Sequence, residues 1–290
     1  MSRVSSQSPS HSLIEAIART LGHSSIAALA TVASAPRHVG AKILIEESGE
    51  RTGTTGDAAL DESVALYSHT FLTSRVEART FNVEEFAPQL EAWRGARVLF
   101  ERIEPEPRLI VCGAGHVGAS LVYQARLIGY RTTLIDDRAD FVTRERFPDE
   151  QVELIGAGSW TEALRLAVGR GRGVSVAVVT RGHNEDEECL RAVLDARPDY
   201  VGLIGSKRRT NIVLERLRAA GVDEERLRQV RAPIGLDIGA VTPEEVALAI
   251  LSEIVAHRRG GTGAPLSAWR RMGEIVQSPK PKVQGQEAGS

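Results

Sequence analysis

Continuous apolar runs of strand length recur through the second half of the chain, and helix-like stretches separate them. Glycine or a charged residue bounds each run on at least one side, which predicts short buried strands. Alternating strands and helices predict an α/β fold, here a Rossmann-like, doubly wound parallel sheet over residues 108–258. We expect strands at 109–112, 132–135, 152–155, 174–179 and 200–204, and helices at 159–168, 186–196, 207–220 and 242–257.

The first third of the chain has a mixed pattern that predicts a smaller α+β domain over residues 12–104. Two prolines in the stretch EPEP, residues 104–107, predict a short, stiff linker between the domains. The polar ends, residues 1–11 and 259–290, predict disordered tails. Within the first domain we expect helical stretches at 12–21, 57–67 and 84–93, strands at 26–33, 41–46 and 97–103, a turn and a Gly/Thr-rich loop after 46, and an extended segment at 71–81.

Composition narrows the functional classes. A net charge of −2 and an aromatic content of 4% argue against binding to nucleic acids, which attract basic and aromatic surfaces. The apolar runs are too short to span a membrane, and the start lacks the apolar core of a signal peptide. Cys112 and Cys189 form neither a metal-spaced pair nor a disulfide framework. We therefore expect a cytoplasmic protein that contacts neither membranes nor nucleic acids.

A glycine motif follows the first strand of the second domain. Gly113, Gly115 and Gly118 have G-x-G-x-x-G spacing where the chain turns into a helix, and Asp136 ends the next strand. In this fingerprint the glycines permit a tight turn, close approach of a pyrophosphate and close helix packing, and the acid binds a ribose diol. The motif therefore predicts a phosphate-bearing, nucleotide-like ligand, and the alternative is a glycine-rich turn without one.

Polar segments also follow the later strands, at the sheet edge where α/β proteins bind ligands. His183 is a candidate ligand contact or proton-transfer group that Asp186 would orient, and a helix-capping network is the alternative. Lys207 lies in a first helical turn, where a cation opposes the helix dipole, so a bound anion would explain it. A basic surface cluster formed with Arg208 and Arg209 is the alternative. For Asp237, in the loop 233–240, ligand contact and domain packing remain equally open.

Several separate motifs resemble the XdhC/CoxI family over most of the chain. They are GAGHVG at 113–118, DDR at 136–138, T-x-x-H-x-x-D at 180–186, YVGLIGSKRR at 200–209, PIGLDIGAVTPEE at 233–245 and, in the first domain, SAPRHVGAKILI at 34–45. The resemblance implies a maturation chaperone without catalytic residues, which carries molybdenum cofactor (molybdopterin) to a xanthine dehydrogenase-type molybdenum hydroxylase. It also implies a cysteine desulfurase as a second partner and a homodimer.

One loop departs from the family pattern, which is roughly G-S-x-G-G-G-C-x-E. The loop here reads GTTGDAALD, so Ala59 stands in place of the cysteine and Asp61 in place of the glutamate. Alanine cannot ligate molybdenum, so no metal ligand is expected. Two further interpretations stay open: an NAD(P)-dependent oxidoreductase, and a regulatory member that binds a nucleotide.

We expect the cofactor to lie in a cleft between the two domains, with its phosphate at residues 113–118. The candidate contact residues are Gly113, Gly115, His116, Gly118, Asp136, Asp137, His183, Asp186, Gly205, Ser206, Lys207 and Asp237.

Overall fold

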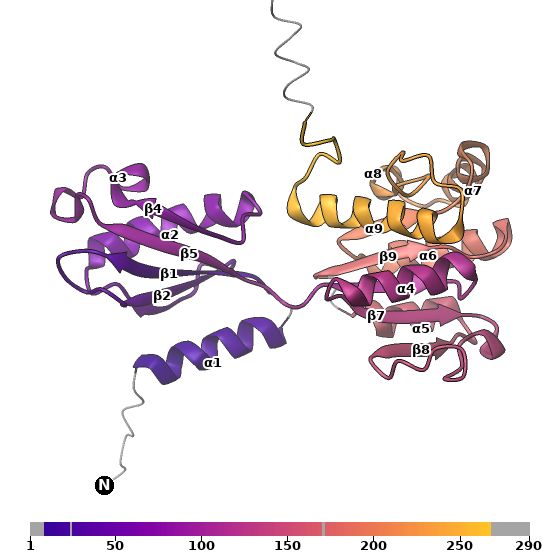
Figure 1. Ribbon diagram of the computed structural model, residues 1–290, viewed down its shortest axis with the longest axis horizontal. Coiled ribbons are helices and arrows are strands. Elements are labelled where there is room, and N and C mark those ends of the chain that lie inside the picture. Colours follow the sequence, from indigo (N-terminus) through magenta and orange to yellow (C-terminus); the bar gives the residue numbers. More distant parts are fainter. Residues whose placement is uncertain (1–8, 24, 170–171, 268–290) are drawn as a thin grey trace, which may run out of the picture.

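The computed structural model describes residues 9–23, 25–169 and 172–267, except for the side chains of Pro9, Ser10 and His183. Two sheets, each with its own helices, form two bodies joined by residues 104–107 (Figure 1). We refer to residues 9–103 as the N-terminal part and to residues 108–267 as the C-terminal part. None of the described helices is both long enough and apolar enough to cross a membrane.

The N-terminal part contains an antiparallel sheet of five strands in the order β3-β2-β1-β5-β4. Helix α1 packs on one face through Ala16, and α2 covers the other through Leu60, Val64 and Phe71. These layers are visible in Figure 1, where α1 and α2 lie on opposite sides of the sheet. The elements are α1 Pro9–Gly22, β1 Ala27–Ser34, β2 Lys42–Glu46, β3 Arg51–Thr54, α2 Ala58–Thr73, β4 Ala78–Asn82, α3 Val83–Phe86, the 3-10 turn η1 Glu91–Trp93 and β5 Arg97–Ile103.

The C-terminal part contains a parallel sheet of five strands in the order β10-β9-β6-β7-β8. This confirms the predicted α/β, Rossmann-like fold. The elements are β6 Arg108–Cys112, α4 His116–Leu127, β7 Arg131–Asp136, the 3-10 turn η2 Ala139–Phe141, β8 Val152–Gly156, α5 Trp160–Val168, β9 Val174–Val178, α6 His183–Ala196, β10 Tyr200–Leu203, α7 Lys207–Ala219, α8 Glu224–Gln229 and α9 Pro243–Arg259.

Apolar clusters cover both faces of the parallel sheet. Helices α4 and α9 pack on one face, where Leu121 and Ile250 are buried, and α5 and α6 pack on the other through Leu164 and Leu190. Strand β6 has almost no exposed side chain because both of its faces are covered. Such continuous burial explains why the strands appear in the sequence as unbroken apolar runs.

Several predicted elements differ from the observed ones. Helix α2 continues to Thr73, so the first residues of the predicted extended segment 71–81 are helical. The Gly/Thr-rich loop contains strand β3, and the predicted helical stretch 84–93 contains only α3 and η1. Helix α8 was not predicted. Most of the predicted tails, 1–11 and 259–290, lies outside the described residues, but His11 belongs to α1 and Arg259 ends α9.

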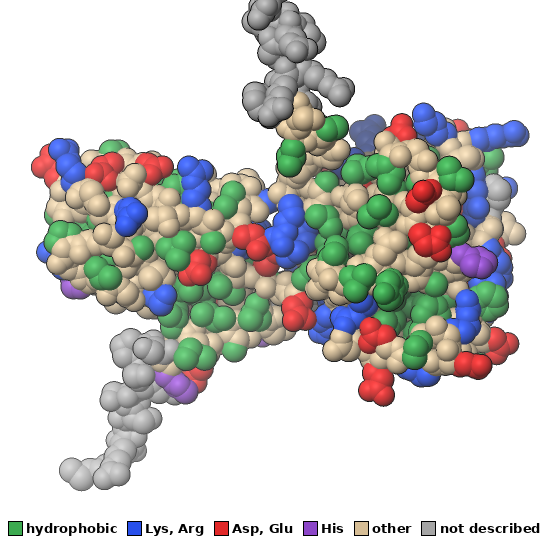
Figure 2. Space-filling model, viewed as in Figure 1, with side chains coloured by type: hydrophobic (Ala, Val, Ile, Leu, Met, Phe, Trp, Pro, Cys, Tyr) green, Lys and Arg blue, Asp and Glu red, His purple; other side chains and the backbone are tan. Residues whose placement is uncertain are grey.

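Charged side chains bridge the junction between the two parts. Each described hydrophobic cluster lies within one part, whereas ion pairs cross the junction or reach the linker. Figure 2 shows blue and red side chains together at this narrow region. The contacts include Arg172 with Glu47 at 2.6 Å, Arg258 with the linker residue Glu104, Arg259 with Glu77, and the Arg75 guanidinium donating to the His257 carbonyl.

Candidate functional site

A cavity of about 460 Å³ lies at the carboxyl edge of the parallel sheet. Strand β6 is central, and the chain continues from it to β7 on one side and later to β9 on the other, so this edge is a topological switch point. The structure brings six predicted site residues to the cavity: Gly113, Gly115, His116, Asp136, Asp137 and Gly205. The other lining residues are Val117, Arg138, Val179, Thr180, Arg181, Glu185, Ile204, Arg209 and Pro243.

The three positions of the motif carry glycine for different structural reasons. Gly113 has φ +116°, and a Cβ there would lie 2.6 Å from the Val179 carbonyl oxygen. A Cβ on Gly118 would lie 1.9 Å from the Gly113 carbonyl oxygen, so close packing of α4 on β6 requires glycine. Gly115 is extended, at φ −72° and ψ −172°, and a Cβ there would meet no atom within 4 Å. The fold therefore requires Gly113 and Gly118 but leaves open space beside Gly115.

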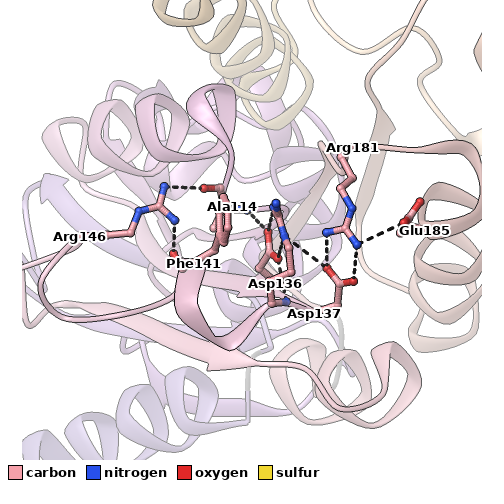
Figure 3. Close-up of polar contacts among 8 residues, drawn as sticks. Ala114, Asp136, Asp137, Phe141, Arg146, Arg181 and Glu185 are labelled. Atoms are coloured by element: carbon pink, nitrogen blue, oxygen red, sulfur yellow. Dashed lines mark hydrogen bonds and ion pairs between the residues drawn. The ribbon is translucent and has the colours of Figure 1, made fainter.

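The Asp136 carboxylate, 2% exposed, is fully engaged within the protein. It accepts the Ala114 backbone N–H at 2.7 Å and three N–H groups of Arg138 at 2.9 to 3.0 Å (Figure 3). Burial alone would raise the pKa of Asp136, but these hydrogen bonds outweigh it and lower the pKa to about 2. Asp136 thus links the glycine loop to Arg138, whose guanidinium stacks on the Phe141 ring. The predicted contact of Asp136 with a ligand ribose stays a prediction.

A more exposed ion-pair group lies beside it. The Arg181 guanidinium donates two hydrogen bonds to Asp137, at 3.1 and 3.2 Å, and lies 3.3 Å from the Glu185 carboxylate (Figure 3). The exposed fractions of the three side chains are 45%, 32% and 30%. Arg181 follows β9 and Asp137 follows β7, so their contact passes across the end of β6, where the glycine loop begins.

A buried network connects the loop after β9 to helices α6 and α7. Asp186 is fully buried, and it accepts hydrogen bonds from the Thr180 hydroxyl and from the Arg209 guanidinium at 2.5 and 2.8 Å. Arg209, which the alternative interpretation placed in a basic surface cluster, instead pairs with Asp186 and lines the cavity. Asp186 itself does not line the cavity, but it holds two residues that do, Thr180 and Arg209.

Three further predicted site residues, Ser206, Lys207 and Asp237, lie outside the cavity lining. Ser206 caps α7 by accepting the Arg209 backbone N–H, and Lys207 is exposed in the first turn of that helix. Asp237 is exposed on the loop 233–240, whose Ile234 fills the space beside Gly202 in β10. The His183 side chain lies outside the described residues, so its orientation by Asp186 stays a prediction.

The loop that departs from the family pattern forms its own hydrogen bonds. The Asp57 carboxylate accepts the backbone N–H groups of Ala59 and Leu60 at the start of α2, and it also accepts the Trp93 indole N–H. The hydrogen bond from Trp93 and those from the helix backbone lower the pKa of Asp57. The first turn of α2, where the family carries cysteine, is thus occupied by a carboxylate of the chain itself.

The two thiols of the chain are both buried. Cys112 lies within β6 and Cys189 within α6. Burial is the main cause that raises the pKa of Cys189, and the nearby Cys112 raises it further. A neutral buried thiol is a poor ligand and nucleophile. Among the described residues, no three His, Cys, Asp or Glu side chains gather as a metal site.

The expected cleft between the domains is not where the glycine loop lies. The linker enters β6 at its amino end, and the glycine loop leaves β6 at its carboxyl end. Five residues of strand separate them, which is roughly 15 Å at about 3.3 Å per residue. A second cavity, of about 350 Å³, does lie at the junction, and Tyr130, Tyr200 and Arg258 line it. The glycine-loop cavity is lined only by the C-terminal part.

The sequence analysis did not identify Arg181 and Glu185, two charged residues that line the cavity. Arg181 and Glu185 flank the histidine of the T-x-x-H-x-x-D motif, so their position after β9 was a usable signal. Pro243 reaches the cavity from the start of α9, far along the chain, and nothing in the sequence indicated this.

Comparison with known proteins finds matches in both parts of the chain. The XdhC Rossmann domain matches residues 109–254, and the XdhC and CoxI family matches residues 24–82. "Uncharacterized protein YqeB" of Escherichia coli (strain K12) is 30% identical over 236 residues, which cover 79% of this chain and 42% of that protein.

Two further relatives have names that describe a role. A protein of Bacillus subtilis (strain 168), named as a probable xanthine dehydrogenase subunit, is 29% identical over 162 residues, 56% of this chain and 46% of that protein. "Molybdenum cofactor insertion chaperone PaoD" of Escherichia coli (strain K12) is 31% identical over 84 residues, 29% of this chain and 26% of that protein. The chain spans less than half the length of each of these three relatives.

Proposed function

Because the chain belongs to the XdhC and CoxI family, we propose that it is an accessory protein that binds molybdenum cofactor and assists the maturation of a xanthine dehydrogenase-type molybdenum hydroxylase. The names of the Bacillus subtilis relative and of PaoD support this role. On this proposal the cofactor is cargo, and the protein is a chaperone rather than an enzyme.

The observation that carries the proposal is the open space beside Gly115. No side chain of the described residues caps the start of α4, and the free N–H groups of its first turn favour an anion. Neither φ nor neighbouring atoms demand glycine at this position, whereas both neighbouring motif glycines are required by the fold. A ligand phosphate that approaches the bare backbone accounts for Gly115, and the cofactor carries such a phosphate.

The described residues fit the phosphate end of the cofactor better than its metal end. The cavity offers the glycine loop, the helix α4 terminus and arginine side chains. Asp57 occupies the start of α2, Ala59 carries no thiol, and both cysteines are buried. The proposal is therefore that the protein holds its cargo by the phosphate end and provides no thiolate to molybdenum.

The test is the cargo that the protein retains when it is purified from a molybdenum-replete host. We expect molybdopterin in the unmodified protein and its loss in Gly115→Val, because the valine side chain would fill the phosphate space at a position where an added Cβ meets no atom within 4 Å. Fluorescence of oxidised pterin and metal analysis measure retention, and circular dichroism checks folding. Gly22→Val, at another glycine with open space and ordinary φ, is the matched control.

A second candidate function is binding of an NAD(P)-like nucleotide, with a regulatory or oxidoreductase role. The intact glycine loop together with Ala59 in place of the family cysteine favours it. Mass spectrometry of the same preparations separates the candidates. Nicotinamide nucleotide without pterin would replace the first proposal with the second, and a protein without either ligand would contradict both.

The proposed role implies specific partners. We propose the client molybdenum hydroxylase as the main partner, a cysteine desulfurase as a source of sulfur for the cofactor, and a second copy of the chain. Since these steps belong to cofactor maturation, we propose that they take place in the cytoplasm. Pull-down from a host that expresses the client tests the first of these partners.

A further inference from the structure

We propose that Arg181 is a phosphate ligand that Asp137 and Glu185 hold until a ligand arrives, so that the cavity contains its own competing anions. This inference deepens the proposed function and rests on it. It names the group of the ligand that is recognised, a phosphate or pyrophosphate, and the residue that binds it.

The position of Arg181 supports the first half of the proposal. Arg181 follows β9, and its contact with Asp137, which follows β7, crosses the end of β6. The glycine loop starts at that end of β6, and Gly113 and Gly115 line the same cavity as Arg181 and Asp137. An anion at the glycine loop would therefore lie beside the Arg181 guanidinium.

The burial of its partners distinguishes Arg181 from the other arginines of the cavity. Arg138 and Arg209 are bound to carboxylates that are 2% and 0% exposed. Releasing either arginine would leave a charge in a dry environment, which is costly. Asp137 and Glu185 are about a third exposed, so water can solvate them when Arg181 leaves. Arg181 is thus the arginine of this group that can exchange a carboxylate for a phosphate.

The same geometry gives Asp137 an opposite role. Its carboxylate accepts from two donors of Arg181, one hydrogen bond to each carboxylate oxygen. A phosphate oxygen accepts from a guanidinium in the same way. Asp137 therefore competes with the ligand, and weakening its charge should favour ligand binding.

The experiment measures inorganic pyrophosphate binding by calorimetry, with the full chain freed of retained cargo. We expect Arg181→Ala to weaken binding at least about tenfold, because a charge-assisted contact is lost. Asp137→Asn should tighten binding about twofold to fivefold, the range of an exposed ion pair. Glu185→Gln should also tighten pyrophosphate binding, but by a smaller factor, because Arg181 lies farther from Glu185 than from Asp137.

A matched ion pair elsewhere in the same part of the chain provides the control. Arg218 donates two hydrogen bonds to Glu224 at 2.6 and 3.1 Å, both side chains are about half exposed, and neither lines the cavity. Arg218→Ala and Glu224→Gln should leave pyrophosphate affinity unchanged. Thermal unfolding of every variant checks that the fold persists.

Opposite signs for Arg181→Ala and Asp137→Asn support the proposal. It is overturned if Asp137→Asn binds pyrophosphate equally or more weakly than the unmodified protein, if Arg181→Ala binds it normally, or if neither the unmodified protein nor Asp137→Asn binds it. These results are distinct from failure of the proposed function. Molybdopterin retention that depends on Gly115 but not on Arg181 would leave the chaperone proposal standing.

Discussion

At the scale of single residues, Asp136 shows how one carboxylate can hold the backbone of a glycine loop in place. Its oxygens accept hydrogen bonds from Ala114, in the glycine loop, and from Arg138. Arg146 adds a second contact to the loop by donating to the Ala114 carbonyl oxygen at 3.2 Å. The backbone N–H and the carbonyl oxygen of Ala114 are therefore both fixed before any ligand binds.

The low pKa of Asp136 predicts a pH-dependent stability. Its folded pKa of about 2 lies below the ordinary value of 3.8, so the ionised form stabilises the fold. The contribution, roughly 2 kcal/mol from about 1.4 kcal/mol per pKa unit, is complete above roughly pH 5 and is lost as the pH falls toward 2.

Asp136→Asn should therefore be less stable than the unmodified protein by roughly 2 kcal/mol at pH 7, and by about half as much at pH 3. Urea unfolding at several pH values measures this difference. Asp140→Asn, at an exposed position in η2, is the control. A difference that stays constant from pH 7 to pH 3 would contradict the assigned cause.

Residue types and spacing predicted the glycines and Asp136, but not what Asp136 contacts. The fingerprint gives the position of the acid at the end of a strand. Whether it binds a ribose or the protein depends on how far Arg138 folds back over it, which is a matter of side-chain geometry. The spacing of residues along the chain contains no such information.

At the scale of elements, the buried carboxylate of Asp186 connects three segments. It lies in α6, accepts from Thr180 after β9, and pairs with Arg209 in α7. The two helices begin on neighbouring strands of the sheet, so this network sets the positions of both helix starts at the cavity edge.

Removing the guanidinium should destabilise this region. We expect Arg209→Met to lower the free energy of unfolding by about 3 kcal/mol, the lower end of the range for a broken buried pair, because Arg209 is 24% exposed. Arg208→Met, at the adjacent exposed position, should change it by no more than about 0.5 kcal/mol. Chemical denaturation measures both, and equal effects would show that Asp186 does not need Arg209.

Elements with long apolar runs were predictable, whereas short polar ones were not. Strand β3 consists of Arg-Thr-Gly-Thr, and Gly53 within it has φ +92° opposite Ile43. Such a strand forms only because β2 provides its hydrogen bonds. The end of α2 was not predicted because its segment is rich in residue types that favour strands. Phe71 and Leu72 nevertheless pack into the core as part of the helix.

At the scale of the whole molecule, the direction of the chain separates the cavity from the junction. The linker precedes β6 and the glycine motif follows it, so the sequence already contained the information that they lie at opposite sheet edges. The prediction of a cofactor cleft between the two domains did not take this chain direction into account. The charged contacts of the junction could not be predicted, because they join residues far apart in the sequence.

The junction should be sensitive to salt because arginines provide its contacts. Charges at this narrow region are screened over about 3 Å in 1 M salt, compared with about 10 Å in 0.1 M salt. We expect small-angle scattering to show a larger radius of gyration in roughly 1 M NaCl than in roughly 0.05 M. Arg172→Ala combined with Arg259→Ala should give the expanded form at low salt, since both arginines pair across the junction.

Arg218→Ala, which removes a surface ion pair away from the junction, should leave the scattering unchanged. Identical scattering curves of the unmodified protein at both salt concentrations would show that ion pairs do not fix the arrangement of the two parts.

The cavity at the carboxyl edge also determines how another protein could reach its contents. The N-terminal part is attached behind the sheet, at the amino edge, and the starts of α4 and α9 surround the cavity at the other end. On the proposed function, an acceptor enzyme would meet the cargo end-on, along the strand direction, and the two parts would not have to separate first. Transfer would then depend on the loops of one sheet edge, and the N-terminal part would remain available to a different protein at the same time.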